Sequence, residues 1–517
     1  MRGWNVERNY NYSEGIYRVT SPVDPKFSQG ALWDAQNMVY EGDSNNPQTI
    51  WGSSRLGATS LADVCSGLFN HDDSTRLIAC AEDGAIYKYT TDWVSATGAR
   101  STGNSSTDGV RWSGRMFYGA TTTANLLVLG NGVDAPVSYE ETGGAIALGG
   151  SPPATGNFPT PWLGRLWLAS GDTLTGSVPD NCENWSTASG AVQFSVMRGF
   201  DGDIIGLAAF KNNLFIFKKS SVYRIGPTTT FTNADALIKN VSGVNGCISH
   251  NTIQECEIGD RTVLVWASEH GYDALGGSDS FDGFEPVDIS RWVKPIYDNR
   301  NTSAAGTMWA LSNPKRREYF APFAIGAAVN PNIALIGNFA RQRKPGRWTT
   351  LLRPNLTAGA MFNGLQYVGD TSGNVYRMHD EDQAGWAGAS ILGRVITKYY
   401  IQGAPESMKL YDWAFASISR LVAGNDLITM RLNLLRQGLP THAGNTGNYT
   451  ANGTLGWGLG QWGVEPWGGQ GTAGQRIRLT SARRGSGLAL VVESTGKYLL
   501  RGTEVSSKIE PSASIAA

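Results

Sequence analysis

The chain has 517 residues, enough for two to four domains and a large hydrophobic core. Its 43 Lys and Arg residues nearly balance 44 Asp and Glu, and the formal net charge of -1 excludes the basic surplus of a dedicated nucleic-acid-binding protein. Glycine is abundant, at 64 residues, and hydrophobic residues reach 41%, which favours a turn-rich β protein and excludes a disordered chain.

The first 58 residues have little hydrophobic periodicity. Over residues 1–58 we expect an N-terminal arm, with Pro22 and Pro25 in an extended segment, and a strand that could close a circular array of sheets. The chain starts without the apolar stretch of a signal peptide, and no later window approaches ~18 uninterrupted apolar residues. We therefore expect neither export by a signal peptide nor a membrane-spanning segment.

Residues 59–385 contain short apolar runs separated by clusters of Gly, Asn, Asp or Ser, a pattern typical of β-hairpins. Each hairpin combines an apolar strand, a polar turn and a return strand, and the turn residues tolerate the positive φ of tight turns. The predicted hairpins include residues 77–89, 214–225, 263–275 and 365–378.

The return strands recur at a regular interval. The separations between Tyr87, Val137, Thr175, Tyr223, Tyr272 and Tyr376 are 50, 38, 48, 49 and 104 residues. Because the last gap is about twice the others, a further unit is expected over residues 319–323 and 333–337. A period of ~50 residues with about four short strands indicates a β-propeller. We predict an all-β fold with a propeller of about seven blades over residues 59–385; β-sandwiches with evenly spaced hairpins are the alternative.

After residue 385 this period disappears, and residues 386–517 are predicted to form a separate β-sandwich-like domain. Strands are expected at residues 391–401, 407–419, 427–434, 477–480 and 488–493. A loop from Arg436 to Gly474 is expected to split this domain, and it contains Trp457, Trp462 and Trp467, each followed by Gly. These tryptophans could pin the loop to its own domain, contact another subunit or stack on sugars.

The chain has few patterns that indicate catalysis or metal binding. Its five cysteines are scattered without a C-x-x-C pair, so we expect buried free thiols, and its five histidines lack the spacing of metal ligands. No nucleophile elbow, P-loop or dinucleotide-binding motif is present. Aspartate-rich turns at residues 201–203 and 279–282 could hold calcium, but such turns are ordinary in hairpins. We expect a protein that is not an enzyme and needs no cofactor or metal.

Two basic clusters stand out against this near-neutral composition. They contain Arg316, Arg317, Arg341, Arg343, Lys344 and Arg347. Such clusters are usually solvated turns; the functional alternative is contact with a neighbouring subunit or with passing nucleic acid.

Four stretches together suggest a family. They are Leu32 to Met38 leading to Trp51-Gly52 and Arg55-Leu56-Gly57, residues 204–225, residues 263–275, and a terminal β domain with a Gly/Trp-rich loop. In these short patterns, which follow one another over most of the chain, the sequence resembles the β-propeller tail proteins of short-tailed bacteriophages, called nozzle, tail-tube or packaged-DNA stabilisation proteins.

The resemblance implies a structural virion protein assembled in the bacterial cytoplasm. Members form a ring, commonly of six copies, beneath the portal and adaptor, where it extends the DNA channel, retains packaged DNA and carries fibres or spikes. DNA would pass through without sequence-specific binding, and the family has no catalytic residues to transfer. The alternative is a carbohydrate-binding or carbohydrate-active propeller for host-surface recognition, which as a glycosidase would need carboxylates and arginines at the blade centre.

Overall fold

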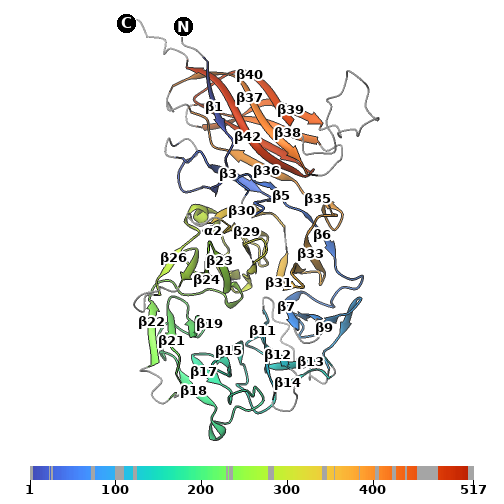
Figure 1. Cartoon of the computed structure of the whole chain (residues 1–517), viewed down its shortest axis with the longest axis vertical. Helices are drawn as coiled ribbons and strands as arrows, with labels where there is room; N and C mark the ends of the chain where they lie inside the picture. The colour runs from blue at the N-terminus through green and yellow to red at the C-terminus, as the bar shows by residue number, and fades with distance from the viewer. Residues whose placement is uncertain are drawn as a thin grey trace.

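A computed structural model of the chain describes most residues between 4 and 509. The described ranges are 4–21, 24, 27–42, 44–71, 76–98, 110–119, 125–141, 143–228, 231, 237–276, 284–340, 346–353, 355–383, 385–401, 407–421, 427–436, 439–450 and 475–509. Strands dominate these ranges, as the glycine-rich and β-branched sequence predicted, and the fold is all-β. It consists of a propeller and a sandwich at opposite ends of the long axis (Figure 1).

The first five blades of the propeller are four-stranded antiparallel sheets, each built from one continuous segment. Blade one has β7 (Cys65–His71), β8 (Arg76–Ala81), β9 (Ile86–Tyr89) and β10 (Trp93–Ser95), and blade two has β11 (Ser113–Tyr118), β12 (Asn125–Gly130), β13 (Val137–Glu140) and β14 (Gly144–Ala147). Blade three has β15 (Asn157–Trp162), β16 (Arg165–Ser170), β17 (Thr173–Gly176) and β18 (Val192–Ser195), and blade four has β19 (Gly206–Phe210), β20 (Asn213–Phe217), β21 (Val222–Ile225) and β22 (Ile238–Ser242). Blade five has β23 (Gln254–Ile258), β24 (Arg261–Ala267), β25 (Tyr272–Gly276) and β26 (Pro286–Asp288). In each blade the second strand is almost wholly buried, which explains its uninterrupted apolar sequence.

The sixth and seventh blades both pair with strands from the N-terminal segment: the sheet of blade six continues into such strands, and blade seven receives its fourth strand from there. Blade six comprises β27 (Leu311–Asn313), β28 (Glu318–Phe323), β29 (Ile333–Asn338) and β30 (Arg347–Leu351). Blade seven has β31 (Leu356–Phe362), β32 (Leu365–Asp370) and β33 (Val375–Asp380), and its fourth strand is β6 (Gly52–Arg55), antiparallel to β33. The short strands β34 (Gly385–Trp386) and β35 (Ala389–Ser390) extend this sheet beyond β6.

The first strands of the blades close a ring. The first strands of blades one to four contact one another in the order β7, β11, β15 and β19, and those of blades five to seven in the order β23, β27 and β31. Between blades four and five, the 3-10 turn η2 (His250–Thr252) contacts both β19 and β24. The ring closes where β31 contacts β7. The other short helices are η1 (Thr187–Ser189), η3 (Arg291–Val293), α2 (Lys294–Tyr297) and η4 (Thr302–Thr307). The circular order of seven sheets identifies a β-propeller.

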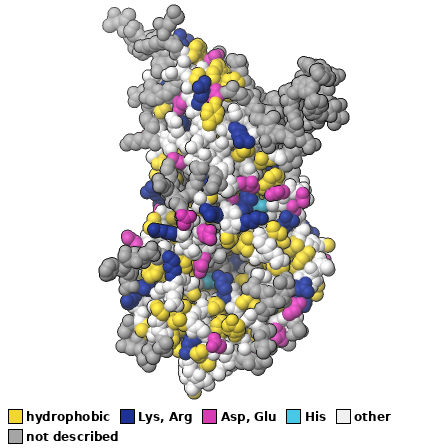
Figure 2. All heavy atoms as spheres, viewed as in Figure 1, with side chains coloured by type: hydrophobic (Ala, Val, Ile, Leu, Met, Phe, Trp, Pro, Cys, Tyr) yellow, Lys and Arg dark blue, Asp and Glu magenta, His cyan; other side chains and the backbone are white. Residues whose placement is uncertain are grey.

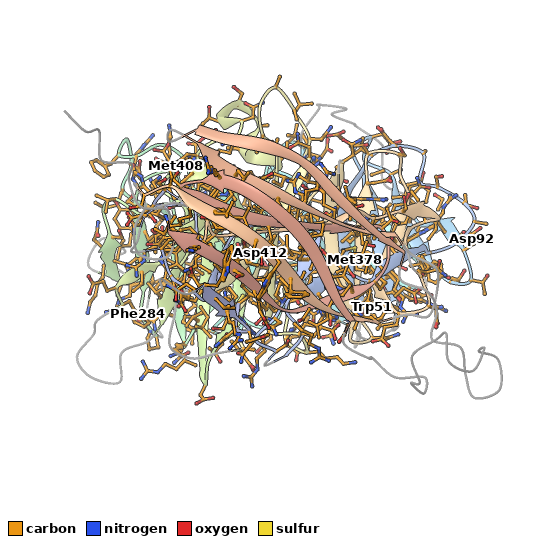
Figure 3. All side chains as sticks on the ribbon, turned by 90° about the horizontal axis from the view of Figure 1, so that it is seen from above. Trp51, Asp92, Phe284, Met378, Met408 and Asp412 are labelled. Atoms are coloured by element: carbon orange, nitrogen blue, oxygen red, sulfur yellow. The ribbon has the colours of Figure 1, made fainter. Side chains whose placement is uncertain are left out.

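The sandwich combines strands from both ends of the chain. One sheet runs β4 (Met38–Val39), β5 (Gln48–Thr49), β42 (Tyr498–Ile509), β37 (Lys409–Arg420) and β40 (Gln475–Gly485), with β1 (Asn5–Asn9) also paired to β42. The other sheet continues blade six, from β30 through β2 (Gly15–Ile16), β3 (Ala31–Gln36), β36 (Gly393–Thr397), β41 (Gly487–Ser494) and β38 (Leu427–Arg436) to β39 (Leu439–Thr450). Seen from above, the long curved strands cross the molecule, and Asp412 of β37 marks one of them (Figure 3).

One hydrophobic core spans the joint between propeller and sandwich. It includes Tyr272 of blade five, Trp348 of blade six, Leu32 of β3 and Leu490 of β41, all almost fully buried. Trp348 stacks on Tyr272 with ring centroids 5.5 Å apart and planes 20° apart. The two parts are therefore continuous in both backbone hydrogen bonding and apolar packing.

The predicted hairpins are confirmed, since residues 77–89, 214–225, 263–275 and 365–378 pair as β8–β9, β20–β21, β24–β25 and β32–β33. All six return-strand residues lie on the third strand of a blade, and residues 319–323 and 333–337 belong to β28 and β29.

Two expectations were wrong. The loop predicted over residues 436–474 contains strand β39 up to Thr450, and the C-terminal domain is not separate, because its second sheet continues blade six through β2 and β3. Local periodicity does not reveal pairing between segments hundreds of residues apart.

Candidate functional site

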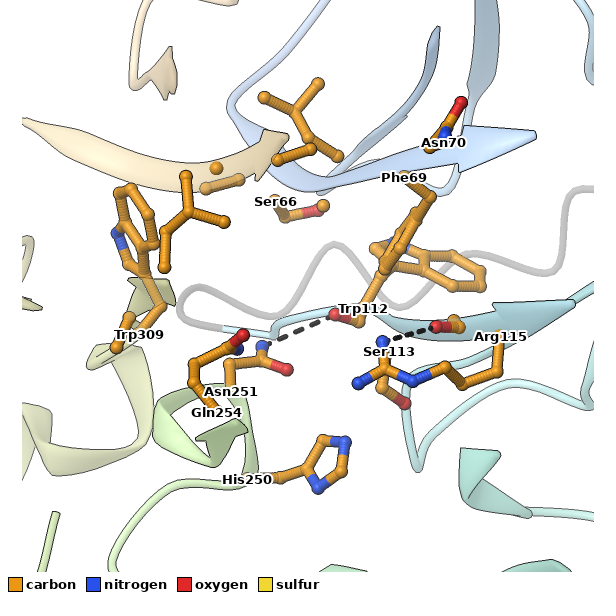
Figure 4. A pocket seen from close by; sticks show the side chains of 18 of the residues that line it. Ser66, Phe69, Asn70, Trp112, Ser113, Arg115, His250, Asn251, Gln254 and Trp309 are labelled. Atoms are coloured by element: carbon orange, nitrogen blue, oxygen red, sulfur yellow. Dashed lines mark hydrogen bonds between the residues drawn. The ribbon is translucent and has the colours of Figure 1, made fainter. Parts of the chain in front are cut away.

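The hub of the propeller contains a cavity of about 410 Å³ that is open to solvent. Its wall comes from the first strands of blades one, two, five, six and seven, and side chains from these strands point into it (Figure 4). Figure 2 shows a hollow near the middle of the propeller, where histidine and basic side chains are visible. The residues labelled at the cavity are Ser66, Phe69, Asn70, Trp112, Ser113, Arg115, His250, Asn251, Gln254 and Trp309.

The turn η2 crosses the hub and connects several blades. The Asn251 amide donates to the Trp112 carbonyl of blade two at 3.3 Å, and the Asn251 carbonyl accepts from the Ala310 N–H beside blade six at 2.9 Å. The His250 ring packs against Phe158 of blade three at a centroid distance of 4.5 Å. These contacts connect the segment before blade five with blades two, three and six at the hub.

Arg115 is the cationic group of the cavity. Arg115 lies on β11, and its side chain lines the cavity and is accessible to solvent. Its guanidinium donates a hydrogen bond to the Gly114 carbonyl at 3.1 Å. Burial among the surrounding strands lowers the pKa of Arg115, and the charge of Glu255 on β23 acts in the opposite direction. Arg115 and Glu255 form no direct ion pair, so the guanidinium retains N–H donors that face the cavity.

His250 is a neutral hydrogen-bonding group in the same cavity. Burial, and after it the positive charge of Arg115, lowers the pKa of His250 to about 3. Its Nδ1 accepts from the Leu207 N–H at 3.4 Å, which assigns the remaining proton to Nε2. His250 therefore offers a donor and no charge at neutral pH.

Arg316 and Arg347 of the predicted basic clusters contact the N-terminal segment. Arg316 pairs with Glu318 at 3.0 Å and with Glu41 at 3.2 Å. Arg347 is only 4% exposed, donates to the carbonyls of Gly42 and Ser44, and lies 4.6 Å from the Tyr40 ring centroid. The expectation of a solvated or ligand-contacting Arg347 is therefore wrong, because its guanidinium is used to hold the N-terminal segment on blade six.

Arg317 is the more exposed member of this group, with its Nε 4.0 Å from Glu257. The remaining basic candidates, Arg341, Arg343 and Lys344, lie outside the described residues, as do Trp457, Trp462 and Trp467 and the aspartates at residues 279–282.

The aspartate-rich turn at residues 201–203 is organised by a lysine. Lys218 is fully buried, and its ammonium donates to the carbonyls of Met197, Phe200 and Gly202 at 3.2, 2.8 and 2.8 Å. Asp201 accepts from the Ser220 N–H and from the Ser221 hydroxyl. The Lys218 ammonium and the Asp201 carboxylate therefore hold this turn by hydrogen bonds within the protein.

Within the described ranges, no group of three or more His, Cys, Asp or Glu side chains could hold a metal ion. All five cysteines are free and buried, as predicted, and burial raises the pKa of Cys65, Cys182, Cys247 and Cys256 to about 12. These thiols are protonated at neutral pH and pack as small apolar groups. No helix in the described part of the chain is long and apolar enough to cross a membrane.

Sequence reasoning missed Arg115 and the role of His250 in the hub. The sequence around Arg115 has no recognisable functional motif, since a single arginine between a Gly and a Met does not indicate a site. The available signal is positional: the first strand of every propeller blade lines the hub, so a charged residue on such a strand is a candidate for the cavity.

No protein-family model matches the chain, and no curated protein matches it. Among solved structures, it is similar to the extracellular domain of a hybrid two-component system from B. thetaiotaomicron, with 9% identity, a TM-score of 0.40, and coverage of 72% of this chain and 42% of that one. It is also similar to Chaetomium thermophilum Raptor, with 12% identity, a TM-score of 0.42, and coverage of 64% of this chain and 29% of that one. Its similarity to the RRP9 WD40 repeats has 8% identity, a TM-score of 0.42, and coverage of 64% of this chain and 99% of that one. The chain spans less than half the length of the first two. These values carry no functional inference, and the propeller assignment rests on the strand order.

Proposed function

We propose that this chain is a structural virion protein, the subunit of a ring that forms the nozzle or hub of a short bacteriophage tail. In this proposal several copies, most simply six, extend the DNA channel beneath the adaptor and portal, retain the packaged DNA and give tail fibres or spikes their attachment. The protein acts mechanically in the virion and is not an enzyme.

The observation that carries the proposal is the ten-stranded sheet shared by blade six and the sandwich. A subunit that must bear the pressure of packaged DNA needs domains that do not rotate against each other, and a continuous sheet with a common core meets this need. Two stretches on which the family resemblance rests, residues 32–38 and 51–57, include β3 and β6, which connect the N-terminal segment to this frame.

In this proposal the DNA passes along the axis of the ring, between the copies. Charges of both signs are mixed on the face seen in Figure 2, which suits passage without tight binding.

Native mass measurement tests the proposal. We expect an assembly of several copies with an interface above ~1,000 Å² per contact, either from the purified chain or in particles that contain it. A protein that is monomeric in solution and also in purified particles would contradict the ring.

A carbohydrate-binding propeller is the second candidate, and the hub cavity favours it. Trp112, Trp309 and Phe69 provide flat apolar walls, and Asn251 and Gln254 provide amides, a combination that suits sugar rings. Saturable binding of a host-surface glycan by a monomeric protein would favour this candidate over the ring.

A further inference from the structure

We propose that the hub cavity is a binding site for one small organic oxyanion, a carboxylate or phosphate attached to a flat apolar group, with Arg115 as its charge partner. This inference is independent of the ring, because the cavity lies within one copy of the chain.

Several hydrogen-bond donors lie around the cavity. Arg115 uses one N–H on the Gly114 carbonyl and presents the others to the cavity. His250 presents its Nε2–H, since its Nδ1 accepts from the Leu207 N–H. Among the described residues, no hydrogen bond involves the Gln254 side chain, whose amide adds two further donors. Convergent donors around one guanidinium favour an anionic acceptor.

Arg115 has no direct carboxylate partner among the described residues. Glu255 is close enough to affect Arg115 electrostatically but makes no ion pair with it, in contrast to Arg111 of the same blade, which lies 3.4 Å from Glu82. Because the Arg115 guanidinium is accessible to solvent and has N–H donors without a protein acceptor, it can form charge-assisted hydrogen bonds with an oxyanion that enters the cavity.

The aromatic lining and the volume of the cavity indicate the shape and size of the apolar part of the ligand. Phe69, Trp112 and Trp309 line the side of the cavity, and Figure 4 shows their rings around the space that the polar groups face. About 410 Å³ lies in the range of small-molecule pockets, large enough for a single ring bearing an acid group.

Calorimetric titration of the full chain with benzoate, inorganic phosphate and benzamide tests the proposal. We expect saturable binding of benzoate or phosphate at a stoichiometry near one, and none of benzamide, which has the same ring without the charge. Arg115→Gln should weaken the anion at least tenfold, and Arg115→Lys, which keeps the charge, should weaken it less. Arg198→Gln, which changes an exposed arginine in the turn after β18, should bind as the wild type does.

The benzoate and phosphate arms distinguish a carboxylate site from a phosphate site. If Arg115→Gln does not fold, Gln254→Ala supplies the second test and should weaken the same anion. The proposal is overturned if neither anion binds at millimolar concentration, if benzamide binds as well as benzoate, or if folded variants at both Arg115 and Gln254 bind like the wild type.

Discussion

Blades one to five and blades six and seven are built in different ways. Each of the first five closes its sheet with strands from one continuous segment, so all of its hydrogen-bonded neighbours lie within about 40 residues in the chain, as the repeat period predicts. Blade six continues into β2 and β3, and blade seven receives β6, strands that precede them by some 300 residues. The first five blades are local structures, whereas blade six is extended and blade seven is completed by strands from the other end of the chain.

This difference has an energetic consequence. Strand pairing over 300 residues requires loop-closure entropy that adjacent hairpins do not, and it joins the two chain ends into one cooperative unit. We therefore expect perturbations of the N-terminal segment or of blade six to affect both the sandwich and the ring closure, and equal perturbations of blades one to five to remain local.

The largest expected effect is that of deleting residues 1–30. The deletion removes β1 and β2 and the side chains of Tyr12, Ile16 and Phe27, which are 0%, 0% and 3% exposed. Loss of three buried side chains at ~2–5 kcal/mol each approaches the whole stability of a domain. We expect no folded protein, or a much lower thermal midpoint by calorimetry. An unchanged midpoint would show that the N-terminal strands are not part of the cooperative unit.

A pair of tryptophan substitutions compares the two classes of blade directly. Trp348 of blade six and Trp167 of blade three are both fully buried, so Trp348→Ala and Trp167→Ala should each cost ~3–5 kcal/mol. Hydrogen exchange should show lost protection in the sandwich strands for Trp348→Ala, and only in blades three and four for Trp167→Ala. Equal deprotection of the sandwich by both variants would remove the distinction between local and long-range blades.

Arg347→Met tests the polar contacts that hold the N-terminal segment on blade six. The variant loses the hydrogen bonds to Gly42, Ser44 and Asn338, and charge-assisted hydrogen bonds are worth ~1.5–3 kcal/mol. We expect chemical denaturation to show a net loss of ~2–3 kcal/mol, since the methionine recovers part of the apolar packing on Tyr40. The matched control Arg317→Met, at a more exposed neighbouring position, should change stability by less than ~0.5 kcal/mol. Similar losses from the two variants would argue against a special role for Arg347.

The smallest expected effect, per pH unit and per histidine, is a pH dependence that arises from the hub and blade seven. Burial lowers the pKa of His250 to about 3 and the pKa of His379 well below its usual value. The folded state therefore disfavours protonation, so the contribution of each neutral histidine is complete above the unfolded pKa of ~6.5 and decreases as pH falls towards the folded value.

Denaturation at several pH values measures this effect. Between pH ~6.5 and 3 stability should fall by at most ~1.4 kcal/mol per pH unit for each histidine, and His250→Gln should reduce the slope. His270→Gln, which changes an exposed histidine outside the hub, is the matched control. A slope that does not respond to His250→Gln would mean that His250 is protonated as readily in the folded as in the unfolded state.

The sequence predicted most of the propeller but little of the hub. Alternation and turn residues identified the hairpins and placed the third strand of six blades correctly, because these features reflect contacts within a few residues. Arg115 and His250 are 135 positions apart, and nothing in their neighbours indicates that they share a cavity. The role of Arg347 was missed for the same reason, since a basic cluster has the same composition on a solvated turn and under a buried segment.

By itself, the sequence determined an all-β chain, a period near 50 residues and cysteines that behave as buried apolar groups, because local patterning and composition govern these properties. The sequence also suggested that a strand within residues 1–58 closes the circular array, as β6 does in blade seven. Only the tertiary structure decided which strand that is, that β3 joins blade six to the sandwich and that Arg115 faces a cavity. The physical reason is that backbone hydrogen bonding between strands is nearly independent of side-chain identity, so pairing partners depend on the geometry of the whole ring. Whether a given side chain is buried depends in turn on which strands the ring places next to it.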